Sequence, residues 1–209
     1  MIQILHPPEA PVSHDVAAAP PTDLVLHALL DLMAARDPGL RAHSVAVARL
    51  SVCIGKALGF RGVRLDRLRR AALLHDVGKL ALPDSILSKP GPLSAREYEA
   101  VREHPSLGNR ITLALGLARE ANWVLHHHER PDGRGYPHGL VEPQIPAEAA
   151  IIHVADAYDA LTSDRPYRKA LPRTRALTAI TAGSGRQFDR DCVAALVTAA
   201  CGEPRAAAA

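Results

Sequence analysis

The amino-acid sequence predicts an all-α fold, a bundle of helices interrupted by one irregular loop. Alanine and leucine, which both favour helices, are abundant along the chain. Hydrophobic residues make up 47% of the sequence but aromatic residues only 3%, so the core must be built from aliphatic side chains. Apolar residues recur at helical spacing in successive segments, and we find no internal repeat and no convincing strand.

The length of 209 residues predicts one domain with a short arm. Residues 1–21 are rich in proline and alanine, and we expect them to form a flexible, extended arm. The domain is expected to span residues 22–202. The alanine-rich tail, residues 203–209, is expected to fray.

The first helices are predicted from their ends. Thr22-Asp23 is a good N-terminal cap for a helix that runs to about Arg36. The Asp37-Pro38-Gly39 sequence is expected to break that helix, and a second helix is expected to start near Ala42 and end at Leu58-Gly59. The third helix is expected from about Leu65 to Asp76.

The later helices follow the same rules. Ser94 with Glu97 has the spacing of a capping box. Pro105 can begin a new helix, which places His104 at a helix junction. The remaining helices are expected near residues 118–129, 146–162, 173–182 and 190–201.

Charge and cysteine content narrow the classes of function. A net charge of +3 suits a phosphate-bearing substrate but is too weak to indicate DNA binding. Cys53, Cys192 and Cys201 lack CxxC spacing, so we interpret them as reduced packing residues of a cytoplasmic protein. No apolar run approaches the ~20 residues of a membrane span, and we recognise no signal peptide.

The stretch Ala72–Lys79 organises the candidate chemistry. His75 shares the buried face of its helix and is followed directly by Asp76, so an imidazole and a carboxylate meet at one point. Gly78 permits a helix stop, and Lys79 places a cation beside the carboxylate. The alternative is a core-facing histidine that only hydrogen-bonds its neighbour.

Further polar residues stand at helix ends or on apolar faces. His43 lies on the apolar stripe of its helix, and Asp156 lies four residues after Ile152 on another, where a carboxylate must be paired or bound to metal. Each residue alone could be a cap or a core histidine. Together, nitrogen and carboxylate donors without thiolates suit Fe, Mn, Zn or Ni. The candidate ligands are His43, His75, Asp76, His104, His127, His128 and Asp156.

Two loops complete the candidate site. Residues 130–139 form a Gly- and Pro-rich loop after the histidine run, and we predict a lid or recognition role for it. Residues 163–169 form a basic loop in which Arg165 and Arg168 could contact phosphate. Either loop could also be a plain connector.

These motifs in this order resemble the HD-GYP phosphodiesterases, a branch of the HD-domain phosphohydrolases. The resemblance runs from about Asp37 to Asp189, most of the chain. It includes His75-Asp76 with Gly78-Lys79, Pro83-Asp84, Lys89-Pro90-Gly91, His104-Pro105, His127-His128-Glu129, Asp132-Gly133, Gly135-Tyr136-Pro137, Gly139-Leu140, Ile145-Pro146, Ala155-Asp156, Tyr158-Asp159-Ala160-Leu161 and Asp164-Arg165-Pro166-Tyr167-Arg168.

The resemblance implies an HD-type helical bundle with an irregular GYP loop and a dinuclear metal centre. Fe or Mn is the expected metal, with other divalent metals as alternatives. One metal would take His43, His75, Asp76 and Asp156, and the second would take Asp76, His104, His127 and His128. Asp76 would therefore bridge the two metals.

The resemblance also implies the reaction. A hydroxide bridging the metals would open cyclic di-GMP to linear pGpG, and a second cleavage could give GMP. Asp76 and Lys79 would be catalytic. Substrate contacts would come from Lys79, Tyr136, Arg165 and Arg168, while Asp37 either caps a helix or contacts substrate. The expected partners are cyclic di-GMP, diguanylate cyclase (GGDEF) domains through the GYP loop, and a second copy in a homodimer.

Three positions depart from the family pattern. Gly39 stands where the trinuclear subset has glutamate, Glu142 where a glycine is usual, and Arg190 follows Phe188-Asp189 where proline is common. Two alternatives to the leading function remain open. One is a phosphohydrolase for another cyclic dinucleotide or nucleotide, and the other is a catalytically weak module that binds cyclic di-GMP or a protein partner.

Overall fold

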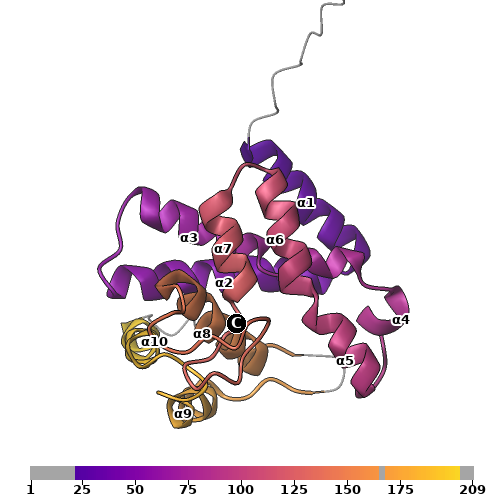
Figure 1. Cartoon of the computed structure of the whole chain (residues 1–209). Helices are drawn as coiled ribbons and strands as arrows, with labels where there is room; N and C mark the ends of the chain where they lie inside the picture. Colours follow the sequence, from indigo (N-terminus) through magenta and orange to yellow (C-terminus); the bar gives the residue numbers. More distant parts are fainter. Residues whose placement is uncertain (1–21, 165–167, 203–209) are drawn as a thin grey trace, which may run out of the picture.

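The computed structural model describes residues 22–164 and 168–202, and within them the prediction of an all-α fold is confirmed (Figure 1). The described residues form helices and two isolated bridges, with no strand. The elements are α1 (Thr22–Arg36), α2 (Pro38–Ala57), α3 (Val63–Leu74), the 3₁₀ helix η1 (Val77–Ala81), α4 (Asp84–Leu87), α5 (Ala95–Arg102), α6 (His104–Ala114), α7 (Ala118–His126), α8 (Ala147–Thr162), α9 (Arg173–Ala182) and α10 (Arg190–Gly202). The predicted arm, residues 1–21, and the predicted tail, residues 203–209, lie outside the described residues.

Helix α2 lies at the centre of the bundle, where it packs against α1, α3, α8 and α10. Helices α6 and α7 pair with each other and lie side by side in Figure 1. The buried core is mainly aliphatic, as expected, and includes Ile54 of α2, Leu68 of α3 and Ile151 of α8. Each such side chain contributes about 1.5–3 kcal/mol by leaving water. This core fixes the helix ends from which the polar site is built.

The start of α2 differs from the prediction. The predicted break at Asp37 is confirmed, because α1 ends at Arg36, but Asp37 also caps α2: its Oδ1 accepts a hydrogen bond from Gly39 N at 2.8 Å. Pro38 fits the first helical position, where no backbone N–H is needed. The helix therefore begins four residues before the predicted Ala42. Only Asp37 separates it from the end of α1.

The predicted capping box of α5 is confirmed. Ser94 Oγ accepts a hydrogen bond from Glu97 N at 3.3 Å, and Glu97 Oε2 accepts one from Ser94 N at 2.7 Å. Lys89 Nζ lies 2.5 Å from the same Glu97 carboxylate. These bonds set the start of α5, whose far end leads directly to His104.

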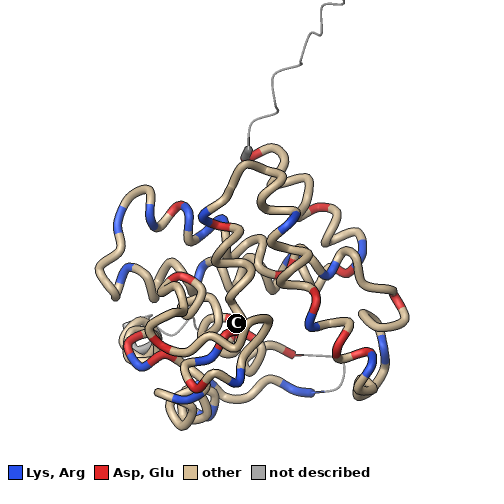
Figure 2. Tube along the Cα trace, viewed as in Figure 1, with Lys and Arg blue, Asp and Glu red and all other residues tan. Residues whose placement is uncertain are grey.

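Charged residues of both signs are interspersed along the described chain (Figure 2). Half-buried ion pairs join helices, including Arg70 of α3 with Glu120 of α7 at 2.8 Å. Cys53 and Cys192 are free thiols, as predicted. None of the described helices combines the length and apolar character needed to cross a bilayer.

Candidate metal centre

Three buried histidines stand where helices end. His75 follows the last residue of α3, His127 follows α7, and His104 stands at the junction of α5 and α6. In each case Nδ1 lies 2.7 Å from a carbonyl oxygen three residues earlier in the chain. These acceptors are Ala72 O, Val101 O and Val124 O. Carbonyls in the last turn of a helix have no partner within the helix, so each imidazole also caps the helix that it follows.

This arrangement fixes the tautomer of all three rings. A carbonyl oxygen only accepts, so Nδ1 must carry the proton and Nε2 presents a lone pair. His104 Nε2 and His127 Nε2 lie 3.3 Å apart, so both atoms face the same point. His75 Nε2 is buried without any hydrogen-bond partner among the described residues. Such buried lone pairs are the donor set that a cation requires.

Asp76 lies between the histidines with its two oxygens facing different groups. Its Oδ1 is 3.3 Å from His104 Nε2, whereas its Oδ2 is 3.5 Å from His75 Nε2 and 3.8 Å from His43 Nε2. Lys79 Nζ lies 2.6 Å from Oδ2. One carboxylate thus reaches both halves of the cluster, and one ammonium stands at its edge.

His43 is held differently from the other rings. Its Nδ1 donates to Asp159 Oδ2 at 2.7 Å, and its Nε2 lies 3.0 Å from Asp156 Oδ1. Asp156 and Asp159 are three residues apart in α8, so both carboxylates face the same way toward α2. Asp159 therefore orients His43 as the backbone carbonyls orient the other imidazoles.

The side chains form two groups that could each hold a metal ion. The ligand atoms of His43, His75 and Asp76 lie within 4.8 Å of one another, and so do those of His104, His127 and His128. Asp156 joins the first group through His43. Three helix C-termini, those of α3, α5 and α7, point their negative dipole ends at the cluster, which also favours a cation. All seven predicted ligands are therefore brought together in one place, and nitrogen and carboxylate donors fit divalent transition metals.

The pKa shifts fit this reading. Burial lowers the pKa of His75, His127 and His128, which keeps these rings neutral and able to bind metal. Burial alone would raise the pKa of Asp76, but Lys79 and the histidines hold it well below its usual value. Asp76 is therefore a carboxylate at neutral pH.

His43 is the exception among the rings. Burial alone would lower its pKa, but hydrogen bonds to Asp156 and Asp159 raise it to about 9. His43 is thus protonated in the absence of metal and must release a proton to bind one.

The GYP loop folds back onto the histidines and does not lie beyond them. Tyr136 N donates to His128 O at 3.2 Å, and the Tyr136 ring lies 4.7 Å from the His128 ring. The Arg102 guanidinium lies over the Tyr136 ring, 4.9 Å from the ring centroid. Gly135 makes the fold possible, because a Cβ there would lie 2.5 Å from the backbone of Glu129 and Arg130.

A buried carboxylate holds the far side of the loop. Glu129 is only 1% exposed, and its two oxygens accept hydrogen bonds from His138 N at 2.7 Å and Leu140 N at 2.9 Å. The sequence motifs predict no separate role for Glu129 or Asp159. The spacing of Asp159 from Asp156 is a signal for Asp159, since residues i and i+3 share a helix face. No spacing rule points to Glu129.

The predicted role of Gly78 is different in the structure. Helix α3 ends before His75, and Gly78 lies inside η1 without a positive φ. A Cβ at Gly78 would lie 2.0 Å from the His104 carbonyl oxygen. Glycine is required because η1 and the start of α6 touch through their backbones, and this contact brings Asp76 to His104.

The predicted substrate residues are less tightly placed. Asp37 is the α2 cap described above, and Arg168 is exposed, with its guanidinium donating to Ala160 O at the end of α8. Arg165 lies outside the described residues. Lys79 and Tyr136 both touch the metal cluster.

Comparison with known proteins gives consistent matches. A family model described as an HD domain matches residues 27–192. The chain is 41% identical over 165 residues to the cyclic di-GMP phosphodiesterase response regulator RpfG of Xanthomonas campestris, covering 78% of this chain and 44% of RpfG. It is 39% identical over 176 residues to a cyclic di-GMP phosphodiesterase of Thermotoga maritima, covering 83% and 48% of the two chains.

A solved structure also matches. The cyclic GMP-AMP specific phosphodiesterase V-cGAP3 of Vibrio cholerae superposes with a TM-score of 0.57 at 33% identity, over 88% of this chain and 42% of that one. The chain therefore spans less than half the length of each of these relatives.

Proposed function

The chain belongs to the HD domain family, in agreement with the HD-GYP branch that its motifs resemble, and from that premise we propose that it is a metal-dependent phosphodiesterase that opens cyclic di-GMP to linear pGpG. The observation that carries the proposal is the position of Asp76. Its two oxygens face two separate groups of histidines, which is the arrangement that a bridging carboxylate needs. The names of the relatives support the substrate.

HD domains bind divalent metal, and we propose a dinuclear centre of Fe or Mn in which His43, His75, Asp76 and Asp156 hold one ion and Asp76, His104, His127 and His128 hold the other. When bound, two such ions lower the pKa of a shared water toward neutrality and offset charge on the phosphoryl oxygens. The protein's own contribution is to orient the ligand side chains through hydrogen bonds to their rings. Nitrogen and carboxylate donors without thiolates support Fe or Mn over a structural zinc site.

Lys79 is the proposed catalytic cation. Its ammonium stands 2.6 Å from Asp76 Oδ2 at the edge of the cluster, where a phosphate group that reaches the metals would pass. From there it can stabilise the negative charge that develops on the phosphoryl oxygens, and the 3′ oxygen is the leaving group. A second cleavage of pGpG would give GMP by the same geometry.

The remaining substrate contacts are proposed from the loops. Arg165 and Arg168 would hold the second phosphate, Tyr136 would contact a base or the partner surface, and Asp37 would combine capping with a substrate contact. Reaching a phosphate requires Arg168 to leave Ala160 O, its acceptor at the end of α8. Guanidinium groups suit phosphate because they offer paired N–H donors.

Cyclic GMP-AMP is a second candidate substrate, because V-cGAP3 is named as specific for it and is 33% identical. The two substrates differ at one base and share the phosphodiester ring, so the metal ligands cannot discriminate between them. A GGDEF domain that docks on the GYP loop and a homodimer are further proposals. The free thiols of Cys53 and Cys192 support the cytoplasmic location that we propose.

Product analysis tests the proposal directly. Anaerobically purified, metal-loaded protein is incubated with cyclic di-GMP and, in parallel, with cyclic GMP-AMP, and the products are separated by chromatography. We expect pGpG from cyclic di-GMP, formed faster than any linear product from cyclic GMP-AMP. Faster turnover of cyclic GMP-AMP would reassign the substrate. Binding of cyclic di-GMP without turnover by fully loaded protein would instead support a binding module.

A further inference from the structure

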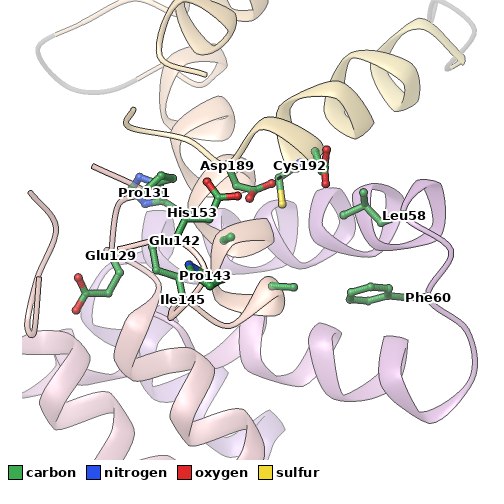
Figure 3. A pocket seen from close by; sticks show the side chains of 13 residues that line it. Leu58, Phe60, Glu129, Pro131, Glu142, Pro143, Ile145, His153, Asp189 and Cys192 are labelled. Carbon is green, nitrogen blue, oxygen red and sulfur yellow. Dashed lines mark hydrogen bonds between the residues drawn. The ribbon is translucent and has the colours of Figure 1, made fainter. Parts of the chain in front are cut away.

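A second cavity lies outside the metal centre, between the loop that follows the histidines, the start of α8 and the start of α10 (Figure 3). Its volume is about 310 Å³, enough for a small organic molecule. None of the seven proposed metal ligands lines it. The lining residues are Leu58, Phe60, Glu129, Pro131, Glu142, Pro143, Ile145, Ala147, Ala150, His153, Asp189, Asp191 and Cys192.

His153 supplies a buried acceptor with nothing bound to it. Its Nδ1 lies 2.9 Å from His127 O, so Nδ1 donates and Nε2 presents a lone pair. The side chain is only 8% exposed, and Nε2 has no hydrogen-bond partner among the described residues. A buried acceptor without a partner is unfavourable, and a ligand that donates a hydrogen bond to it would remove that cost.

Three further lining residues bring acceptors. Asp189, Asp191 and Glu142 carry carboxylates, and no lining residue in the described chain is Lys or Arg. Asp189 Oδ1 accepts a hydrogen bond from Cys192 N at 2.8 Å. Glu129 is already occupied by two loop amides. Arg64 lies outside the lining, over the Phe60 ring and 3.4 Å from its centroid. The lining itself therefore favours a ligand that donates hydrogen bonds and carries positive charge.

Apolar walls define the rest of the ligand. Leu58 and Phe60 close one side, and Ile145 with Pro143 closes the side formed by the loop (Figure 3). Exposed Glu142 and Asp191 stand toward solvent, whereas His153 and Cys192 are buried. We propose that this cavity binds a small organic cation, an amidinium or ammonium group on an apolar body, with His153 Nε2 and Asp189 as the acceptors.

The site would be coupled to the metal centre without sharing its residues. His153 is the link, because it bonds the backbone of His127 and its ring lies 6.0 Å from the ring of His128. An occupant would also contact Glu142, Pro143 and Ile145, at the far end of the segment that carries Tyr136. Binding of such a cation goes beyond the proposed hydrolysis and does not depend on it.

Benzamidine is a suitable probe, because it joins an amidinium to a flat apolar ring. Its neutral analogue benzamide has nearly the same shape without the charge. Isothermal titration of each compound into the metal-loaded chain should give one benzamidine per chain and about tenfold or more weaker binding of benzamide. Equal binding of the two compounds, or no binding of benzamidine at its highest soluble concentration, would overturn the proposal.

Two substitutions of His153 separate its two nitrogens. His153→Asn retains a donor near the Nδ1 position but removes the acceptor, whereas His153→Gln can retain an acceptor near the Nε2 position. We expect His153→Asn to weaken benzamidine binding by about tenfold and His153→Gln to weaken it less. The opposite order would show that binding does not use Nε2.

Glu142→Gln tests the site without touching the core, because Glu142 is exposed. It should weaken benzamidine binding severalfold, while the matched control Asp66→Asn, on the exposed face of α3, should leave it unchanged. Equal effects of both substitutions would show general charge attraction and not a site in this cavity.

Discussion

His104 Nε2 and His127 Nε2 lie 3.3 Å apart, and each ring has already committed its proton to a backbone carbonyl on its other side. A cation placed at this point would lie close to both nitrogens. The geometry is therefore one that a metal site requires. Asp76 and His128 stand beside the same pair, so the negative charge and the third nitrogen of a metal site are already in place.

Asp76→Ala should abolish turnover and lower the content of both metals, because one carboxylate faces both groups of histidines. Metal content is measured by elemental analysis after reconstitution. The control is Asp66→Ala on the exposed face of α3, which should keep both metals. Full metal occupancy in the Asp76 variant would contradict the bridging role.

Lys79→Ala should retain both metals but lose about tenfold to a thousandfold in kcat, equivalent to ~1.4–4 kcal/mol of transition-state stabilisation. The reason is that Lys79 touches the cluster only through Asp76 and supplies charge to the phosphate, not a metal ligand. Lys56→Ala removes an exposed ammonium from the last turn of α2 and should leave kcat unchanged. A Lys79 variant with normal kcat would remove this residue from the mechanism.

Asp159→Ala should weaken the metal held by His43 by about tenfold to a hundredfold and leave the group of His104 and His127 loaded. Asp159 orients the His43 ring by accepting a hydrogen bond from its Nδ1, so the ring would turn more freely without this carboxylate. Asp159→Asn keeps a carbonyl acceptor for His43 Nδ1, so it should lose less metal affinity than Asp159→Ala. Metal affinity is measured by competition with a chelator, and equal loss at both groups of ligands would count against a local effect.

Tyr136→Ala should raise KM for cyclic di-GMP and also loosen His128, because the Tyr136 ring lies 4.7 Å from the His128 ring. Tyr136→Phe keeps that contact and the position of Arg102 over the ring, so it should retain metal affinity. Steady-state kinetics and chelator competition separate the two effects. If both variants behave as wild type in both measurements, the loop is only a connector.

The centre should hold two metals and not three. Gly39 lies in the first turn of α2, four residues before His43 and on the same face, and it offers no ligand atom. Elemental analysis with anomalous diffraction at the iron and manganese edges should give two full sites. A third full site next to Gly39 would contradict this expectation.

Gly39→Glu extends the same test. A Cβ at Gly39 would lie 3.0 Å from Asp37 Oδ1, so the α2 cap must shift, at a cost of about 1 kcal/mol. We expect the variant to be slightly less stable and to gain a third metal, while Gly39→Gln should show the loss of stability with weaker metal gain.

The sequence predicted the helices and pointed to seven side chains that the structure brings together, because each carries a local signal. His75 and His104 stand at helix ends that caps and prolines reveal, and Ser94 with Glu97 marks the start of α5. The start of α2 was wrong because Asp37-Pro38 serves equally well to end one helix and to begin the next. In the structure it does both, and how closely α2 follows α1 depends on how the two helices pack, which a local pattern does not contain.

The features that were missed depend on distant contacts. Gly78 is needed because the His104 carbonyl approaches it, a contact between elements that the sequence separates. The bond from His43 to Asp159 joins residues 116 positions apart. The sequence shows that the loop of Tyr136 follows the histidine run, but not that it turns back through Gly135 onto His128. Such contacts arise from the path of the chain and have no periodicity to reveal them.

Three histidines each donate a hydrogen bond to the carbonyl three residues earlier, and these bonds affect the free energy of metal binding. Rotamer and tautomer are chosen by the ring's own helix end, before any ion arrives, so little side-chain entropy remains to be lost on binding. The centre is therefore preorganised on one side, by backbone. His43, by contrast, takes its orientation from a carboxylate of another helix and must lose a proton, so we expect the two halves of the centre to fill in sequence, with the side of His104 and His127 first.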